Sequence, residues 1–490
     1  MIGESKEIKE VSMRKEPNII LIVIDALRVK NLSCYGRSGL NSPNIDRLAR
    51  EGVLFENAYA CINATDPSLT TIFSGKYPIS HGIINHGSKV SDEEIKRFYA
   101  SNTLLLPQVL KSKGYVTLAV DWLGRWHRRG YDYYSGILKD GLFRGQSKGD
   151  LRKKSMKRVL YIHMKRLRRL LARFLFLSSL QMSRTNVYGD ASLVTNKAIE
   201  LIKGKENLDR SFFLFLHYWD THTPYNSPKA NIRELNNDAE HFYIEDVIGQ
   251  IRNKARRNYV RQLGSSVSEI VAKYNGAISF IDHEIGRLIK KLDQQELLDE
   301  TILIITGDHG ESLTEHGVYF DHHCLYEDII HIPLVLKAPF LPRNKRVRGF
   351  VQHTDIMPTI LDILNEKVDE YFDGESLLPL IYGQTDQLHK AIYVEEVQTQ
   401  WKRLLMTDGY KYIYAPSEEN AVCSSCGIVH GGLEELYDLT NDPSEKENIV
   451  EKRREIADML RKQLDEWINY LKGKRGKENI RSKIQRLKGV

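Results

Sequence analysis

The chain has 490 residues, of which 41% are hydrophobic, and it carries a formal net charge of +7. This length suggests two to four domains with a sizeable core, and we expect one large domain with a smaller appendage. The five cysteines are few and mostly isolated, which argues against a secreted disulfide framework. Residues 1–17 are charged and contain no apolar segment of the signal-peptide type, so the composition predicts a cytoplasmic protein.

The positive charge is concentrated in one segment. Residues 151–186 contain eleven Lys or Arg and no Asp or Glu, which leaves 60 basic against 64 acidic residues in the rest of the chain. Within residues 151–180, apolar side chains recur at helical spacing between basic ones. This pattern predicts a helix that lies on an anionic membrane surface, with a solvated helix or a partner-binding arm as equal alternatives. Nucleic acid is not expected, because the charge forms one local stripe with few aromatic residues.

Apolar runs alternate with helical patterns along the first three quarters of the chain. We expect strands over 18–24, 116–120, 212–216, 301–306 and 333–336, and helices over 45–51, 104–113 and 269–292. This alternation predicts an α/β fold, a mostly parallel sheet covered by helices on both faces. Ligands of such sheets bind beyond the carboxyl ends of the strands. The polar side chains expected at that edge are Asp25, Asp220, His222, Asp308 and His309.

From about Gly374 the pattern changes. Strands are expected over 391–395 and 403–414, with a turn at Asp408-Gly409, and a helix over 452–471. We therefore predict a catalytic domain over 1–374, with a basic helical insert at about 145–185, and a small α+β subdomain over 375–490.

Thr65 is the candidate nucleophile. Pro67 fits the first turn of a helix, so Thr65 is expected at a helix N-terminus, where an anion is favoured. A threonine hydroxyl needs a base or a metal to activate it. A divalent ion bound by Asp25, Asp308 and His309, next to Thr65 itself, would do so. The competing interpretation is a helix-capping threonine without chemistry.

Several motifs together resemble the sulfatase-like branch of the alkaline phosphatase superfamily, over nearly the whole chain. They include the segments 17–25 and 42–59, Gly307-Asp-His-Gly-Glu311, Thr354-Asp-Ile-Met-Pro-Thr359 and Glu435-Leu-Tyr-Asp-Leu439. The resemblance implies an alkaline phosphatase-like fold and a metal-dependent enzyme that acts on an ester of an anionic group.

The chain departs from the sulfatase pattern at the nucleophile. In the sulfatases that the chain resembles, the nucleophile segment reads Cys-x-Pro-Ser-Arg or Ser-x-Pro-Ser-Arg, and its first residue is converted to formylglycine. This chain has Thr65 at the first position and Leu69 in place of the Arg. After Gly114-Tyr115 the chain reads Asp121-Trp122, so the Lys of the family's Gly-Lys-Trp-His signature is expected to be missing. A Thr nucleophile resembles the phosphate-processing relatives. We therefore expect a phosphoester hydrolase or transferase, with a sulfuric ester hydrolase or a non-catalytic binding protein as alternatives.

The metal ligands depart from the family as well. In the sulfatases that the chain resembles, an Asp-Asp pair and a later Asp-Asn pair hold calcium. This chain has Asp25-Ala26 and Asp308-His309 at these positions. An imidazole ligand favours Mn²⁺ or Zn²⁺ over Ca²⁺. We expect one divalent ion, with Mn or Zn favoured and Ca as the alternative.

Other polar residues are candidates for substrate contact or proton transfer. His222 matches the family histidine that contacts the transferring group, and His322 lies where relatives often have a substrate-contacting Lys; either could act as a general acid. The further candidates for substrate contact are Lys76, Asp220, His316, His323 and Arg28. The alternative for the histidines is a structural hydrogen bond, and for Arg28 a surface ion pair. The expected substrate is a small, lipid-linked or polymeric anionic ester.

Cys423 and Cys426 are two thiols separated by two residues, with His430 nearby. A zinc site needs about four ligands, and only these three candidates are close in the sequence. A disulfide or free thiols are therefore preferred to a metal site.

Overall fold

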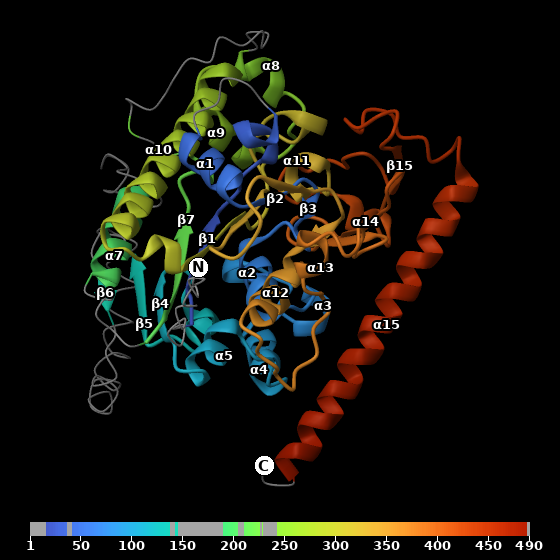
Figure 1. Ribbon diagram of the computed structural model, residues 1–490. Coiled ribbons are helices and arrows are strands. Elements are labelled where there is room, and N and C mark those ends of the chain that lie inside the picture. The colour runs from blue at the N-terminus through green and yellow to red at the C-terminus, as the bar shows by residue number, and fades with distance from the viewer. Residues whose placement is uncertain are drawn as a thin grey trace, which may run out of the picture.

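The computed structural model describes residues 16–36, 42–137, 143–145, 190–203, 210–225, 228 and 243–487 (Figure 1). The basic insert predicted at about 145–185, and the membrane-binding helix within 151–180, lie outside these residues except for Gly145, and both stay predictions. No helix in the described part of the chain is long and apolar enough to cross a bilayer.

The centre of the molecule is a nine-stranded sheet with the order β10-β2-β9-β8-β1-β7-β4-β5-β6. Strand β1 is a continuous apolar run buried along its whole length, as expected for a strand covered on both faces. The strands are β1 (Asn18–Ile24), β2 (Val53–Phe55), β4 (Val116–Val120), β5 (Tyr133–Ile137), β6 (Phe143–Gly145), β7 (Phe212–Tyr218), β8 (Thr301–Gly307), β9 (Leu334–Lys337) and β10 (Lys345–Val347).

The sheet is mostly parallel, which confirms the predicted α/β class. Strand β1 pairs in parallel with β7 and β8, and β4 pairs in parallel with β5 and β7. Strand β9, which the apolar pattern also predicted, runs antiparallel to β8 and β2. The carboxyl ends of β1, β7 and β8 therefore meet at one edge of the sheet.

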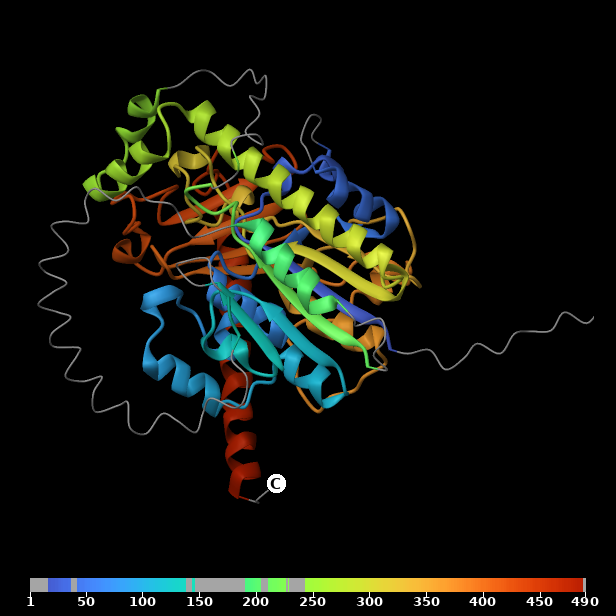
Figure 2. The same ribbon diagram turned by 90° about the vertical axis from the view of Figure 1, so that its left-hand side faces the viewer.

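Helices cover both faces of the sheet. Alternate residues of β1 belong to two cores, Ile20 and Ile22 to one and Ile19 and Leu21 to the other. The first core contains α1 (Pro43–Glu51), α7 (Ala191–Ile202), α8 (Ile244–Ile248), α9 (Lys254–Leu263) and α10 (Val267–Gln294). The second contains α2 (Thr65–Ser74), α4 (Asp92–Ala100), α5 (Leu106–Ser112), α12 (Ile356–Ile363) and α13 (Leu378–Ile381). Figure 2 shows α7 and α10 in front of the strands.

The C-terminal part forms a separate antiparallel sheet, as predicted for the α+β subdomain. Its order is β12-β13-β14-β15, and α15 packs against β13, β14 and α3 and lies along the outer side of this sheet (Figure 1). The elements of this part are β12 (Ile392–Glu396), β13 (Lys402–Met406), β14 (Tyr410–Tyr414), α14 (Glu418–Ala421), β15 (Glu434–Asp438) and α15 (Arg454–Leu487). Helices α3 (Pro78–His81) and α11 (Glu327–Ile330) come from earlier in the chain. A short parallel pair, β3 (Ala58–Tyr59) and β11 (Val351–Gln352), forms a third, two-stranded sheet.

Candidate active site

Two neighbouring strands bring the predicted metal ligands together. Asp25 follows β1, and Asp308 and His309 follow β8, which is its parallel neighbour with Ile24 opposite Gly307. One donor atom from each of the three side chains lies within 4.8 Å of the others, and all three side chains are buried. The group therefore has the placement that one shared cation requires.

Asp308 and His309 each make hydrogen bonds through one side-chain atom and leave a second atom, able to bind a metal, without a hydrogen-bond partner. Oδ1 of Asp308 accepts the backbone N–H groups of Ala26 and His309, at 3.1 and 2.9 Å, while Oδ2 has no partner. Nδ1 of His309 lies 2.8 Å from the carbonyl oxygen of Gly310, so Nε2 is left as the free lone pair. Nε2 lies 3.6 Å from Oδ1 of Asp25 and 3.5 Å from Oδ2 of Asp308.

The electrostatics of this group favour a bound cation. Burial, Asp308 and Glu311 raise the pKa of Asp25 well above its usual value, because each of them opposes a negative charge there. Burial also lowers the pKa of His309 to about 3, which keeps the imidazole in the neutral form that binds metals. Buried, unpaired carboxylate oxygens are costly without a positive charge. These residues therefore fit the predicted divalent ion, whose identity among Mn, Zn and Ca stays a prediction.

Thr65 is the first residue of α2 and is buried beside this group. Its hydroxyl lies close enough to Asp25 to oppose the increase in the carboxyl pKa. A second residue of the helix ties it to the metal ligands, since the Ser68 hydroxyl donates to the carbonyl oxygen of Asp308 at 2.7 Å. The positive end of the α2 dipole thus faces the cluster, where it favours an anionic group.

Two residues around Asp66, the neighbour of Thr65, were missed in the sequence. Arg125 and His127 contact the carboxylate of Asp66, with Arg125 Nη2 at 3.0 Å and His127 Nε2 at 3.3 Å. Burial opposes the charged carboxylate, but hydrogen bonds to His127 and His86 outweigh it and hold the pKa of Asp66 well below its usual value.

The Lys of the family's Gly-Lys-Trp-His signature is missing, as expected, but a basic residue takes its place. The chain reads Gly124-Arg-Trp-His127, three residues beyond Asp121, with Arg in place of Lys. The sequence therefore contains a variant of this signature, which begins three residues after Asp121.

His217 is a second residue that the sequence analysis missed. It lies on β7, directly opposite Val23 of β1. Its Nδ1 is 2.9 Å from Oδ1 of Asp121, and its unpartnered Nε2 is 3.9 Å from Oδ2 of Asp25. Asp121 therefore orients His217 toward the metal-ligand group, in the way that a carboxylate orients a metal-binding or catalytic imidazole. The pairing of β1 with β7 explains this placement.

His222 and His322 both lie at the edge of this group. The ring of His322 stacks on His309 with centroids 4.1 Å apart, and His222 lies 5.5 Å from His322. Burial lowers the pKa of His222 to about 4 and that of His322 to about 3. Nδ1 of each ring faces a carbonyl oxygen, of Thr223 and of Asn63 respectively. Both imidazoles are therefore neutral near pH 7 and present Nε2 as an acceptor, which suits a base better than the predicted general acid.

The other predicted substrate contacts have protein partners elsewhere. Oδ1 of Asp220 accepts the N–H of Ala191 at the start of α7, and the ammonium group of Lys76 lies 2.6 Å from Glu370. The guanidinium of Arg28 is buried between Glu315 and Asp328, at 2.5 and 2.9 Å. These contacts tie all three residues to other parts of the protein, and their predicted role in substrate binding stays a prediction.

His316 and His323 lie at the junction with the C-terminal subdomain. The His316 ring stacks on Tyr326, with centroids 3.8 Å apart, and His323 contacts Cys426. No contact described for either side chain joins it to Asp25 or Thr65, so their predicted role in substrate binding stays a prediction.

Comparison with protein families gives two matches. Residues 17–366 match the model of the family described as sulfatase, and residues 314–470 match the model described as the C-terminal part of N-sulphoglucosamine sulphohydrolase. The first match contains all the predicted metal ligands and Thr65.

Individual proteins and solved structures agree with these matches. The uncharacterized sulfatase YidJ of Escherichia coli is 25% identical over 93% of this chain and 87% of its own. A structure with its substrate D-glucosamine-2-N,6-O-disulfate has a TM-score of 0.67 at 20% identity and covers 94% of this chain and 99% of its own. The phosphonate monoester hydrolase of Agrobacterium radiobacter also has a TM-score of 0.67, at 19% identity, and covers 94% of this chain and 96% of its own. At these identities the two structures show a shared fold.

Proposed function

The chain belongs to the sulfatase family and is a hydrolase of ester bonds, and we propose that it cleaves a phosphoric or phosphonic ester with Thr65 as the nucleophile. The observation that carries this proposal is the position of Thr65. It is the first residue of α2, buried next to a carboxylate–imidazole group whose donor atoms lack protein partners. A divalent ion bound there would polarise the ester oxygens and favour the ionised hydroxyl.

The chemistry of threonine supports phosphorus rather than sulfur. A formylglycine hydrate expels sulfate by reverting to the aldehyde, and a Thr sulfate ester has no such exit. With a phosphoester, the Thr65 oxygen forms a bond to phosphorus while the bond to the leaving alcohol breaks, and the alcohol departs with a proton. Water, or an acceptor alcohol in a transferase, then attacks phosphorus, the bond to Thr65 breaks, and the hydroxyl regains its proton. His222 and His322, each with Nε2 as a free acceptor, are the proposed carriers of that proton.

A sulfuric ester is the second candidate, and the comparisons favour it. Similar proteins include an arylsulfatase of Clostridium perfringens and an N-acetylglucosamine-6-O-sulfatase of Bacteroides thetaiotaomicron. Arg125 also supplies the basic residue whose absence had argued against sulfate. Direct attack by Thr65 would then require the sulfate to leave Thr65 by a second displacement at sulfur.

Matched aryl esters distinguish the two candidates. The purified chain, loaded in turn with Mn²⁺, Zn²⁺ and Ca²⁺, is assayed with the 4-nitrophenyl phosphate monoester, the phosphate diester, the phenylphosphonate ester and the sulfate. Because one structural neighbour holds a sulfated glucosamine, glucosamine 6-phosphate and 6-sulfate are added as a sugar pair. Turnover of a phosphorus ester that Thr65→Ala abolishes supports the proposal. Turnover of sulfate esters alone assigns the second candidate.

A further inference from the structure

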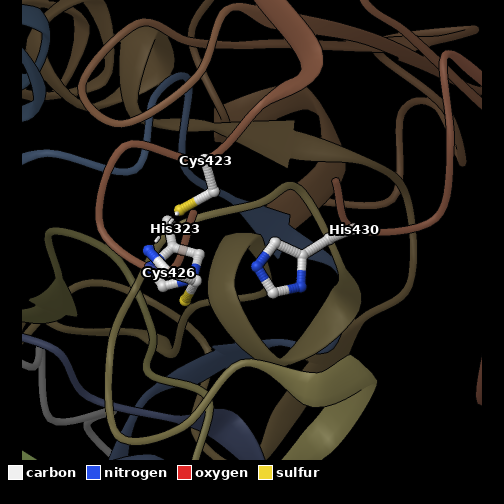
Figure 3. A group of neighbouring side chains, drawn as sticks. All are labelled: His323, Cys423, Cys426 and His430. Carbon is white, nitrogen blue, oxygen red and sulfur yellow. Dashed lines mark hydrogen bonds between the residues drawn. The ribbon is translucent and has the colours of Figure 1, made fainter. Parts of the chain in front are cut away.

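A second group of metal-ligating side chains lies apart from Thr65, at the junction with the C-terminal subdomain. It consists of His323, Cys423, Cys426 and His430, which point toward one another in Figure 3. One donor atom from each lies within 4.8 Å of the others, and each residue is at most 3% exposed. Zinc binds sulfur at about 2.3 Å and imidazole nitrogen at about 2.0–2.1 Å, so the spread of these four donors is close to what one ion requires.

The two cysteines are held in a tight turn that suits a metal knuckle. The backbone bridge between Val422 and Val429 closes the loop, and the N–H of Cys423 donates to the carbonyl oxygen of Ile428 at 2.8 Å. The N–H of Cys426 points at Sγ of Cys423, 3.4 Å away, a contact that stabilises a thiolate. Gly427 follows with φ +76°, a conformation that a side chain rarely adopts. The backbone thus turns both sulfur atoms to the same side.

Each histidine of the group has an oxygen atom near one ring nitrogen, and its other ring nitrogen is directed toward the group. Nδ1 of His323 lies 3.3 Å from Oδ2 of Asp321, and its Nε2 lies 3.2 Å from Sγ of Cys426. Nδ1 of His430 lies 3.3 Å from the carbonyl oxygen of His316, and its buried Nε2 has no partner. Metal-binding histidines show this arrangement, because an acceptor on one nitrogen orients the other toward the ion.

The two sulfur atoms of the group are available to a metal ion. Cys423 and Cys426 are both free and buried, so no disulfide occupies the position. The sequence lacked a fourth ligand only because His323 precedes Cys423 by 100 residues. With His323 the donor set is complete, and two thiolates with two imidazoles suit zinc.

We propose that His323, Cys423, Cys426 and His430 bind one structural zinc ion that fastens the loop carrying His322 to the C-terminal subdomain. The proposal does not rest on the function assigned to Thr65. His323 is adjacent to His322, whose ring stacks on the metal ligand His309. On the other side, the carbonyl oxygen of Cys426 accepts the N–H groups of Arg252 and Asn253, at 2.9 and 3.0 Å. The ion would thus join the loop of His323 to the loop of residues 423–430, and these hydrogen bonds connect the second loop to the start of α9.

Metal analysis of the full-length protein, purified under reducing conditions without chelator, tests this site. We expect about one equivalent of zinc that is lost in Cys423→Ser and in His430→Ala. The matched controls are Cys34→Ser and His283→Ala, which remove a cysteine and a histidine outside the group and should keep the zinc. Asp308→Asn should also keep it, because Asp308 belongs to the group beside Thr65. That variant separates a failure of this proposal from a failure of the proposed function.

Wild-type protein provides a second measurement if the variants fail to fold. Titration with an organomercurial thiol reagent should release the zinc, and protein loaded with Co²⁺ should show thiolate-to-cobalt charge transfer and the strong visible bands of a tetrahedral site. A reagent that releases no zinc, a cobalt spectrum without charge transfer, or a Cys423–Cys426 disulfide in the protein as isolated would each overturn the proposal.

Discussion

The two metal-ligating groups of this protein differ in their donors and in their immediate neighbours. The group at the edge of the central sheet offers two carboxylates and one imidazole, and the Thr65 hydroxyl and two neutral histidines stand beside it. The group at the subdomain junction offers two sulfurs and two imidazoles. Both are buried, so burial does not distinguish them. An incomplete donor set with polar neighbours suits catalysis, whereas a complete set of four suits a structural ion.

Replacement of Thr65 should give the largest effect on activity. Thr65→Ala should lower kcat on the order of 10³-fold or more, as loss of a nucleophile does in other covalent enzymes, and Thr65→Ser should keep part of the activity. Steady-state kinetics on the best aryl ester measure this, with metal content as the control. Full activity in Thr65→Ala would show that the hydroxyl of Thr65 is not the attacking group.

Asp308→Asn should have the second largest effect on activity. The amide oxygen can still accept the N–H groups of Ala26 and His309, but the unpartnered carboxylate oxygen becomes an NH₂ group that binds no cation. We expect at least the 10- to 100-fold loss of metal affinity that follows removal of an outer-shell partner. Activity should fall in parallel and recover partly at high metal concentration. A variant that binds the divalent ion as tightly as the wild type would remove Asp308 from the site.

Arg125→Ala should have a smaller effect. Because the Arg125 side chain is 32% exposed, loss of a hydrogen bond from it to a charged group should cost about 1.5 kcal/mol, the lower end of the usual range, which corresponds to about tenfold in kcat/KM. Arg125→Lys should restore much of it, since Lys is the residue of the family signature, and Arg128→Ala is the neighbouring control. Equal kcat/KM values for Arg125→Ala and the wild type would assign Arg125 to the support of Asp66 alone.

Cys423→Ser should have the smallest effect on chemistry and a larger one on stability. Because metal binding contributes to folding free energy, the thermal midpoint should fall, while kcat falls only as far as His322 loses its position. Cys34→Ser should change neither quantity. Calorimetry with and without added zinc measures this, and a midpoint that responds to zinc in Cys423→Ser as it does in the wild type would contradict the contrast between the two groups.

The sequence by itself determined much of the fold and which polar residues meet beyond the ends of β1 and β8. Apolar runs predicted the strands β1, β4, β7 and β8, because a strand buried on both faces must be apolar along its length. The polar residues that follow β1 and β8 could be paired in advance, because parallel neighbours end at the same edge. The antiparallel direction of β9 was not visible, since an apolar run carries no sign of its direction.

Only the tertiary structure decided which distant side chains meet. Lys76 and Arg28 were predicted to contact substrate, and their carboxylate partners Glu370 and Glu315 lie hundreds of residues away. His217 reaches Asp25 through the pairing of β7 with β1, and His323 completes the cysteine group from a loop 100 residues earlier. The physical reason is the same in each case. The sequence shows which chemical group each side chain carries. It does not show which other side chains surround that group, because tertiary packing brings together segments that are far apart in the chain.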